Sequence, residues 1–449
     1  MRNVLFATII LLLFYGCSTS DSPEEVEKIT VNLPTLTTLA VTDIEETSAT
    51  VGGNISNNGG ANVSERGVVW ATTPNPTEND NKLLIGTGTG NFSSTLSDLE
   101  ENTEYFIKAY ATNSKGTTYG EEQSFTTLQP EPVQKIYEGT IDLNNQDLVE
   151  SFGAEGYTEI TGDLRIFGTV TDLSPLSSIE LLGGDLIVSN ASNLVSVNGL
   201  ENLVSTGNVV QFISNDLLTD ISALADLSVT TAIFFIGNDA LQTISGFSQT
   251  KSLNSLLRID NNASLETISG FHNLEMLGTN LQITNNPVLT DLSGFSNLTS
   301  LSGGQAELWL NNNDSLTDIT PLSSLEMANG IVISGNAMLK EINIFNLLSS
   351  LKFVEITNNR ELTSIQGFDS LTNLDWQIQI DSNILLTSIT AFSNLTSVGE
   401  RFQIRNNSVL DDFCIFNNLI INGFSESFIV SSNLYNPTLQ DMIDGNCKL

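Results

Sequence analysis

The sequence is poor in the residues that most often carry chemistry, because it contains one histidine and three cysteines. One histidine cannot supply a His-based zinc site or a two-histidine catalytic pair, and three cysteines fall short of a four-thiolate zinc site. No Asp-x-Asp-x-Asp-Gly calcium loop occurs either. We therefore expect no bound metal and no cofactor.

Basic residues are scarce as well. Lys and Arg total 16 against 52 Asp and Glu, so the formal net charge is −36. Nucleic-acid binding requires a basic stripe, and this composition therefore excludes nucleic acid as a partner. The acidic residues are spread over the chain rather than gathered in a tail, which is typical of a solvating coat on an exported protein.

Long hydrophobic runs are absent except at the N-terminus. Val4 to Tyr15 is an apolar run behind Arg2 that is too short to span a bilayer, and it predicts a signal peptide over residues 1–16. The run ends in Gly16-Cys17, which resembles a bacterial lipobox. The resemblance implies that Cys17 is the lipid attachment site. A secretory signal with a chance cysteine is the alternative.

Residues 17–33 are predicted to form a flexible acidic tether. The segment after Cys17 resembles the one that directs Bacteroidota lipoproteins to the outer face of the outer membrane. It implies a lipid-anchored outer-membrane protein that faces the cell exterior and contacts the membrane through its N-terminal lipid only.

Residues 34–127 carry short alternating apolar segments separated by turn residues, which predicts a β-sandwich. The stretch Leu99 to Ala111 resembles the strand-corner region of fibronectin type III domains, with Tyr105 as the corner tyrosine. Residues 128–135 are predicted to be a linker.

An asparagine recurs with steps of 23 to 27 residues through residues 136–449, which predicts a solenoid of about 24-residue coils. The spacing leaves no room for a long helix, so each coil should be strand, turn, short strand, turn. The asparagines should satisfy backbone groups in the turns and bond one another along the solenoid. They are Asn215, Asn238, Asn262, Asn286, Asn313, Asn336, Asn359, Asn383, Asn407 and Asn433.

The repeat, as in Leu257-Arg258-Ile259-Asp260-Asn261-Asn262, resembles leucine-rich repeats and, more closely, the receptor L domain. This resemblance implies an all-β chain, a fibronectin-like sandwich followed by a right-handed β-helix-like solenoid. Both solenoid ends need caps, and Ile136 to Tyr157 should supply the first. With Cys17 used for lipid, Cys414 and Cys447 should pair as a disulfide in an exported protein.

Catalytic candidates are few. His272 occupies an ordinary polar position of the repeat, which leaves serine or cysteine nucleophiles without a base. Acidic pairs could serve a β-helical enzyme that acts on polysaccharides, and Asp411-Asp412 or the strand positions Asp260 and Asp381 are the suggestive ones. We expect no catalysis; a carbohydrate-active enzyme or a mainly structural surface component are the alternatives.

The outward positions of the main strands are more informative, because apolar residues cluster in the N-terminal half while the C-terminal half is mostly polar. We predict a ligand-binding face there for a glycan or protein at the cell surface. The alternatives are packing of another domain or an end cap, and plain β-propensity. Its residues are Phe167, Ile187, Ile213, Phe234, Ile236, Arg258 and Trp309.

Overall fold

The computed structural model describes residues 30–130, 134–229, 231–422, 424 and 426–449. The predicted signal peptide 1–16, the lipid site Cys17 and the first part of the tether, through residue 29, lie outside the described residues. The chain divides into two compact units, Met1–Val133 and Gln134–Leu449. This boundary falls within the predicted linker 128–135.

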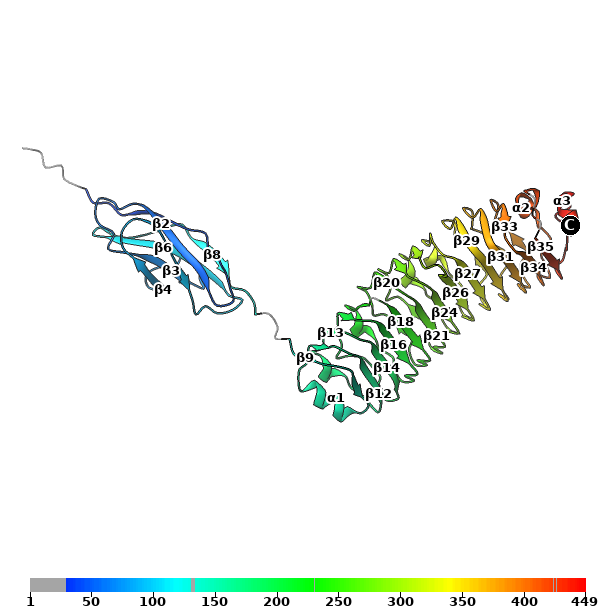
Figure 1. Ribbon diagram of the computed structural model, residues 1–449, viewed down its shortest axis with the longest axis horizontal. Coiled ribbons are helices and arrows are strands. Elements are labelled where there is room, and N and C mark those ends of the chain that lie inside the picture. The colour runs from blue at the N-terminus through cyan, green and yellow to red at the C-terminus, as the bar shows by residue number, and fades with distance from the viewer. Residues whose placement is uncertain (1–29, 131–133, 230, 423, 425) are drawn as a thin grey trace, which may run out of the picture. The chain divides into compact units, whose positions relative to one another are not determined.

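The first unit is a β-sandwich of short antiparallel strands, as the alternating pattern predicts (Figure 1). One sheet has the order β1-β2-β5, and the other has the order β4-β3-β6-β7 with β8 also paired to β6. Val51, Val68, Ile107 and Phe125 are among the side chains buried in its core. The strands are β1 (Thr35–Thr38), β2 (Ala49–Asn57), β3 (Glu65–Ala71), β4 (Asn81–Gly86), β5 (Gly90–Leu96), β6 (Glu104–Asn113), β7 (Gly116–Tyr119) and β8 (Gln123–Thr126).

Tyr105, near the start of β6, holds the loop that leads into this strand. The backbone N–H of Glu100 donates to its hydroxyl at 2.8 Å, and its ring stacks on Phe125 with 5.7 Å between centroids. The arrangement is the tyrosine corner that the sequence predicts.

The second unit is a β-solenoid, in which each coil adds one strand to a long parallel sheet (Figure 1). Each strand pairs in register with the equivalent strand of the coils before and after it. We call this the main sheet. Its path runs through β10 (Ile141–Leu143), β12 (Leu164–Gly168), β14 (Leu186–Ala191), β16 (Val209–Ile213), β18 (Ala232–Ile236), β21 (Leu257–Asp260), β24 (Leu281–Thr284), β26 (Glu307–Asn311), β27 (Gly330–Ser334), β29 (Ser350–Thr357), β31 (Asn373–Asp381), β34 (Arg401–Arg405) and β35 (Ser427–Ser431).

The sequence predicts two strands in each coil, but the coils have three sides. Short parallel ladders of two-residue strands form the other two sides. One side contains β9 (Ile136–Tyr137), β11 (Glu159–Ile160), β13 (Leu181–Leu182), β15 (Ser205–Thr206), β17 (Ser228–Val229), β20 (Ser252–Leu253), β23 (Met276–Leu277) and β25 (Ser300–Leu301). The short strand β33 (Ser397–Val398) instead pairs with the first residues of β31 in the main sheet. The other contains β19 (Thr243–Ile244), β22 (Thr267–Ile268), β28 (Glu341–Ile342), β30 (Ser364–Ile365) and β32 (Ser388–Ile389).

In several coils a 3-10 turn follows the strand of the main sheet. An aspartate two residues ahead accepts a hydrogen bond from the first backbone N–H of the turn, as Asp291 does from Ser293 at 2.7 Å. A short acidic side chain at this position stabilises the tight turn locally. The turns are η1 (Ser174–Leu176), η2 (Ser222–Leu224), η3 (Ser293–Phe295), η4 (Thr320–Leu322) and η5 (Cys414–Phe416), preceded by Asp172, Asp220, Asp291, Asp318 and Asp412.

The repeated apolar positions form one continuous core. In the coil that begins at Asn262 the side chains of Leu265, Ile268, Phe271 and Leu274 are fully buried. Phenylalanines of successive coils stack, with 5.9 Å between the ring centroids of Phe271 and Phe295. No single coil could enclose these side chains, and stacking therefore stabilises every coil through its neighbours.

The predicted asparagines are buried and form a ladder along the solenoid. The side-chain oxygen of Asn383 accepts hydrogen bonds from the backbone N–H and the side-chain amide of Asn359, at 3.0 and 3.2 Å. The Asn359 amide also donates to the backbone oxygen of Ile333 at 3.0 Å. Equivalent amide bonds link the other steps from Asn215 to Asn433, except that Asn383 bonds Asn407 through its backbone N–H alone. The asparagine therefore replaces the backbone pairing that each strand loses where it turns.

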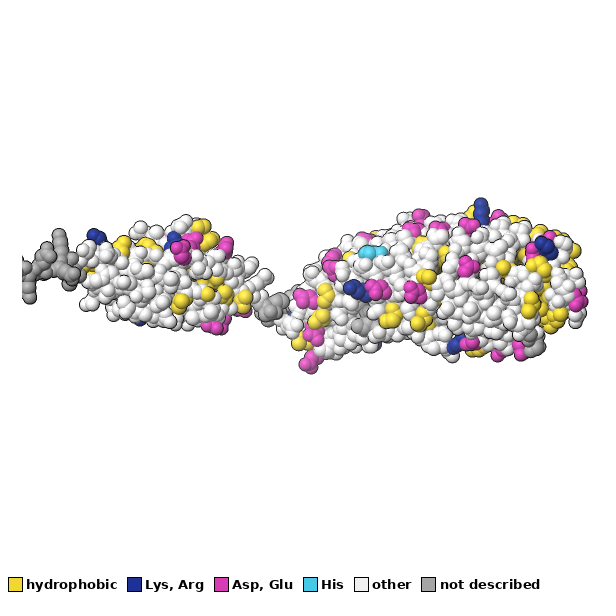
Figure 2. Space-filling model, turned by 90° about the horizontal axis from the view of Figure 1, so that it is seen from above, with side chains coloured by type: hydrophobic (Ala, Val, Ile, Leu, Met, Phe, Trp, Pro, Cys, Tyr) yellow, Lys and Arg dark blue, Asp and Glu magenta, His cyan; other side chains and the backbone are white. Residues whose placement is uncertain are grey.

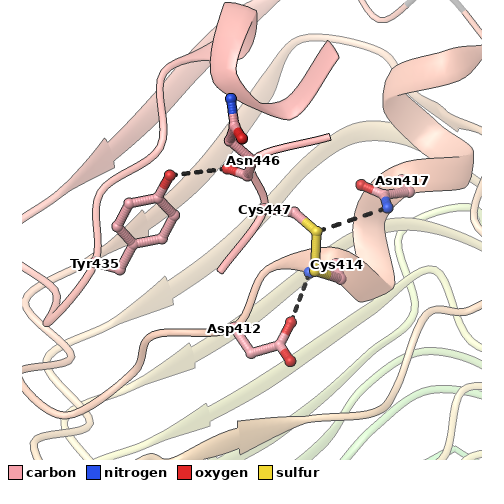
Figure 3. The surroundings of a disulfide bond; sticks show 6 residues. All are labelled: Asp412, Cys414, Asn417, Tyr435, Asn446 and Cys447. Atoms are coloured by element: carbon pink, nitrogen blue, oxygen red, sulfur yellow. Dashed lines mark hydrogen bonds between the residues drawn. A yellow bond between two sulfur atoms is a disulfide. The ribbon is translucent and has the colours of Figure 1, made fainter. Parts of the chain in front are cut away.

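Both ends of the solenoid are covered. At the first, α1 (Gln146–Gly153) buries Val149 and Phe152. At the other lie α2 (Asn417–Ile421) and α3 (Leu439–Ile443), and a disulfide joins Cys414 to Cys447 with 4.9 Å between their Cα atoms (Figure 3). The Tyr435 hydroxyl donates to the Asn446 backbone oxygen beside it at 2.8 Å. These elements cover the core at the first and last coils of the solenoid.

Candidate ligand-binding face

The main sheet turns every second side chain away from the solenoid core, and we call this surface the outer face. Register pairing aligns equivalent residues of successive coils, so that they form columns along the solenoid. The first column runs Arg165, Ile187, Gln211, Phe234, Arg258, Gln282, Trp309, Val332, Glu355, Gln379, Gln403 and Ile429. The predicted alignment of this column agrees with the register.

The residues predicted for the binding face fall in two places. Ile187, Ile213, Phe234 and Ile236 lie half-buried on the neighbouring strands β14, β16 and β18, and Ile213 pairs directly with Ile236. We call these four residues the apolar patch. Phe167, also half-buried, lies on β12 at the edge of this group.

Trp309 and Arg258 lie outside the apolar patch. Trp309 is on β26, which strands β21 and β24 separate from β18. Arg258 pairs with Phe234 in register, but its guanidinium donates to Asp260 at 2.6 Å. The structure therefore does not gather the seven predicted residues into one site.

Asp260 and Asp381 are nearly buried and saturated with hydrogen bonds. Asp260 accepts from Thr284 at 2.6 Å and from Asn285 at 2.9 Å, in addition to Arg258. Burial alone would raise the pKa of Asp260, but these hydrogen bonds and the Arg258 charge lower it below its usual value. Arg405, Asn406 and Ser382 have the same effect on the pKa of Asp381 against its burial.

Such carboxylates are poor general acids, because a lowered pKa keeps them ionised. Register pairing places Asp260 on β21 and Asp381 on β31 five strand steps apart, which at about 4.8 Å a step is roughly 24 Å. Glycosidase carboxyl pairs lie about 5 to 10 Å apart. Asp412 instead caps η5. These acids therefore form structure rather than a catalytic pair.

A depression of about 530 Å³ opens on the outer face around Trp309, across β26, β27, β29 and β31. We call it the aromatic depression. Its lining includes Glu307, Trp309, Asn311, Phe353, Glu355 and Trp376.

Two aromatic side chains from the long strands β29 and β31 form one wall. The rings of Phe353 and Trp376 are parallel within 4°, with 5.9 Å between centroids. Phe353 lies over Gly330, where an added Cβ would come 2.4 Å from the ring. Gly330 therefore provides the space in which the Phe353 ring lies flat against the sheet.

A bulge places Trp376. Leu351 pairs with Leu374 and Phe353 with Gln377, so that two residues of β31 oppose the single residue Lys352. Bulges redirect side chains at the sheet surface. Trp376 is consequently 44% exposed, although it lies in the middle of the nine-residue strand β31.

Polar side chains of the depression are already held in place. The Trp309 indole N–H donates to Glu307 at 2.7 Å, and the Gln377 amide donates to Glu355 at 2.6 Å. Within the part of the chain that the structure describes, the side-chain oxygen of Asn311 is enclosed and has no hydrogen-bond partner. The depression therefore combines a flat aromatic wall with oriented acceptors.

Sequence reasoning found Trp309 but missed Phe353 and Trp376. Phe353 and Gln377 each lie two residues before the first column, outside the part of the strand that recurs in every coil. Trp376 lies in a bulge, which a strict alternation of inward and outward side chains does not predict. The available signal was the run Leu351 to Thr357 followed by Leu374 to Asp381, which extends both strands beyond the usual repeat.

Acidic side chains are scattered over the visible surface of each unit rather than gathered in one patch (Figure 2). Among the described residues, no cluster of His, Cys, Asp or Glu could hold a metal ion. In the same part of the chain, no helix is long and apolar enough to cross a membrane.

No family model and no curated protein matches the chain. Among solved structures, the sensor domain of the anti-sigma factor RsgI4 from Pseudobacteroides cellulosolvens is 19% identical, covers 22% of this chain and 99% of its own, and has a TM-score of 0.19. The human KIAA0970 fibronectin type III domain is 21% identical, with 26% and 90% covered and a TM-score of 0.18. A domain of human fibronectin type III domain containing protein 3 is 20% identical, with 26% and 94% covered and a TM-score of 0.16.

The strand topology defines the class of the chain. It is an all-β protein with a fibronectin type III-like sandwich followed by a β-solenoid of about 24-residue coils.

Proposed function

We propose that the protein is a recognition protein of the cell surface that binds a glycan or protein ligand through the outer face and carries out no catalysis. The observation that supports this is the aromatic depression, in which the exposed Trp376 and oriented polar groups lie on the mostly polar C-terminal half of the outer face. Exposed aromatic residues set among polar ones are typical of binding surfaces.

The proposed location of the protein is the outer face of the outer membrane, where a lipid on Cys17 anchors it and residues 17–33 form the tether. The support is the lipobox-like sequence before Cys17 and the acidic segment after it. Several acyl chains on one cysteine would anchor the protein stably. Cys17→Ala should shift the full chain from the detergent phase to the aqueous phase of a phase-partition assay. A variant that stays in the detergent phase contradicts the anchor.

The hydrogen bonding and the separation of the candidate catalytic aspartates favour a binding protein over a carbohydrate-active enzyme. Asp260 and Asp381 are hydrogen-bonded structural groups that lie far apart, and His272 is exposed at an ordinary repeat position. The steps of the repeat also stay between 23 and 27 residues, without the long insertions that would carry a catalytic pair.

The outer face is tested with a double variant. The full chain and its Phe234→Ala/Trp309→Ala variant are compared in pull-downs from surface extracts and on glycan arrays. We expect the double variant to lose binding to the ligand that the parent protein retains, because it truncates a side chain in both apolar regions of the face. Unchanged binding by a folded double variant would reject the outer face as the recognition surface.

A further inference from the structure

The aromatic wall of the depression has the form of a stacking platform. Trp376 keeps 44% of its surface exposed, and the buried Phe353 ring, which is 8% exposed, supports it in a parallel stack. The face of an aromatic ring carries partial negative charge, so it attracts C–H groups that carry partial positive charge. The platform therefore suits a ligand with a flat surface of C–H groups.

The remaining groups suit hydroxyls. A carboxylate offers about four lone-pair sites. Glu307 accepts one hydrogen bond from Trp309, and Glu355 accepts one from Gln377, which fixes the orientation of each side chain. Free lone pairs therefore remain to accept hydrogen bonds from a ligand.

We propose that the aromatic depression is a saccharide-binding site, in which one sugar ring stacks on Trp376 while its hydroxyls donate to Glu307 and Glu355. This assignment rests on the proposed function and narrows its ligand to a neutral glycan. A pyranose combines a C–H face with hydroxyls around its edge, which is the combination that the depression presents. Its volume of about 530 Å³ is that of a small-ligand site.

A cationic ligand fits less well, although carboxylates and aromatic rings together can bind quaternary ammonium groups. The ammonium of Lys352 already lies 5.5 Å from the Trp376 ring centroid. It is fixed by a hydrogen bond to the backbone oxygen of Gly304. A second cation over the same ring would be repelled by this charge.

The position of the site also favours a glycan chain. Beyond Glu355 the first column continues with Gln379 and Gln403 on β31 and β34. The half-buried Gln379 amide extends the row of polar groups along the solenoid from the depression, whereas Gln403 is buried and its amide faces Asp381. A longer glycan could therefore run along the outer face while one ring stacks on Trp376.

The experiment uses the full chain in detergent on an array of neutral oligosaccharides, with choline and a trimethyllysine peptide as cationic probes. Sugars that bind are then titrated by calorimetry. We expect Trp376→Ala to weaken sugar binding by about tenfold or more and Trp376→Phe to weaken it less, because a flat ring remains. Glu355→Gln should also weaken binding. Leu347→Ala is the control, because Leu347 is 51% exposed and lies outside the strands of the main sheet, and it should bind as the parent does.

The outcomes separate the two proposals. Sugar binding that survives Trp376→Ala, or that Leu347→Ala weakens as much, overturns the site. Binding of choline or the peptide instead of sugars overturns the ligand class. If no sugar binds and the Phe234→Ala/Trp309→Ala variant loses a protein ligand, the saccharide site fails while recognition by the outer face stands. Equal thermal unfolding of Trp376→Ala and the parent shows that lost binding is not lost folding.

Discussion

The two units satisfy the polar groups of buried backbone in different ways. In the sandwich, strands far apart in sequence pair with one another, and the buried asparagine Asn113 bonds three backbone groups of nearby loops. In the solenoid, each strand pairs with those one coil away, and every coil through the middle contributes an asparagine to the ladder. A defect in the sandwich should therefore remain local, whereas a defect in the ladder reaches the coils on both sides.

The largest effect that this comparison predicts is for Asn359→Ala. The substitution removes the acceptor of the Asn336 backbone N–H and the donor to the Ile333 backbone oxygen, and both groups are buried. An unsatisfied buried group costs about 1 to 3 kcal/mol, so the free energy of unfolding should fall by about 4 kcal/mol. Hydrogen exchange of the solenoid should report the loss in neighbouring coils as well.

Asn113→Ala and Asn343→Ala are the matched variants. Asn113 is only 4% exposed, yet its partners lie in loops near the surface, and its loss should cost about 2 kcal/mol and leave solenoid exchange unchanged. Asn343 is exposed, and its loss should change stability by less than about 0.5 kcal/mol. Equal costs for Asn359→Ala and Asn113→Ala would show that stacking adds nothing to a buried asparagine.

The second effect concerns the end of the solenoid. Replacing Cys414 and Cys447 together by serine opens a loop with a sequence separation of 33 residues. In the chain-entropy model this lowers the free energy of unfolding by about 3 to 4 kcal/mol. Hydrogen exchange should accelerate first in the last coils, which lose their cover. An unchanged exchange pattern in α2, α3 and β35 would show that packing alone closes this end.

A smaller effect is expected in the sandwich. Tyr105→Phe removes the acceptor of the Glu100 backbone N–H and keeps the ring on Phe125. The cost should be about 1 kcal/mol, measured by denaturant unfolding followed through Trp70 fluorescence in a Trp309→Phe/Trp376→Phe background. Ladder asparagines should exchange as before. A loss as large as that of Asn359→Ala would contradict the local character of the sandwich.

Much of the solenoid could be predicted from sequence because its rules are local. Asparagine spacing, the aliphatic positions and the column alignment all follow from a repeat in which each coil meets the same environment. The left-handed residue before many ladder asparagines, such as Asn261 with φ of 58°, explains why Asn-Asn recurs there.

The candidate site was less predictable because it departs from the repeat. Trp376 is exposed through a bulge, and Phe353 lies flat only because Gly330 on the next strand lacks a side chain. Both depend on the pairing of particular strands, which a periodic pattern does not contain. The aspartates were misleading for a related reason, since their partners come from the adjacent coil, as Thr284 and Asn285 do for Asp260.

The smallest predicted effect is a difference in how the stability of each unit depends on pH. In the solenoid the pKa values of Asp260 and Asp381 are lowered, so these ionised groups stabilise the fold above the unfolded pKa of about 4, and this stability is lost as pH falls further. In the sandwich, burial and the Glu65 charge raise the pKa of Tyr110 to about 12, so its stabilisation is lost as pH rises from about 10 to 12.

Acid should therefore weaken the solenoid and alkali the sandwich, as region-resolved unfolding against pH would measure. Asp260→Asn should reduce the acid dependence of the solenoid, because the amide does not titrate, and Tyr110→Phe should reduce the alkaline dependence of the sandwich. The two single variants serve as controls for each other, since each alters one unit. If Asp260→Asn leaves the acid profile of the solenoid unchanged, the carboxylate network on the outer face does not contribute to its stability.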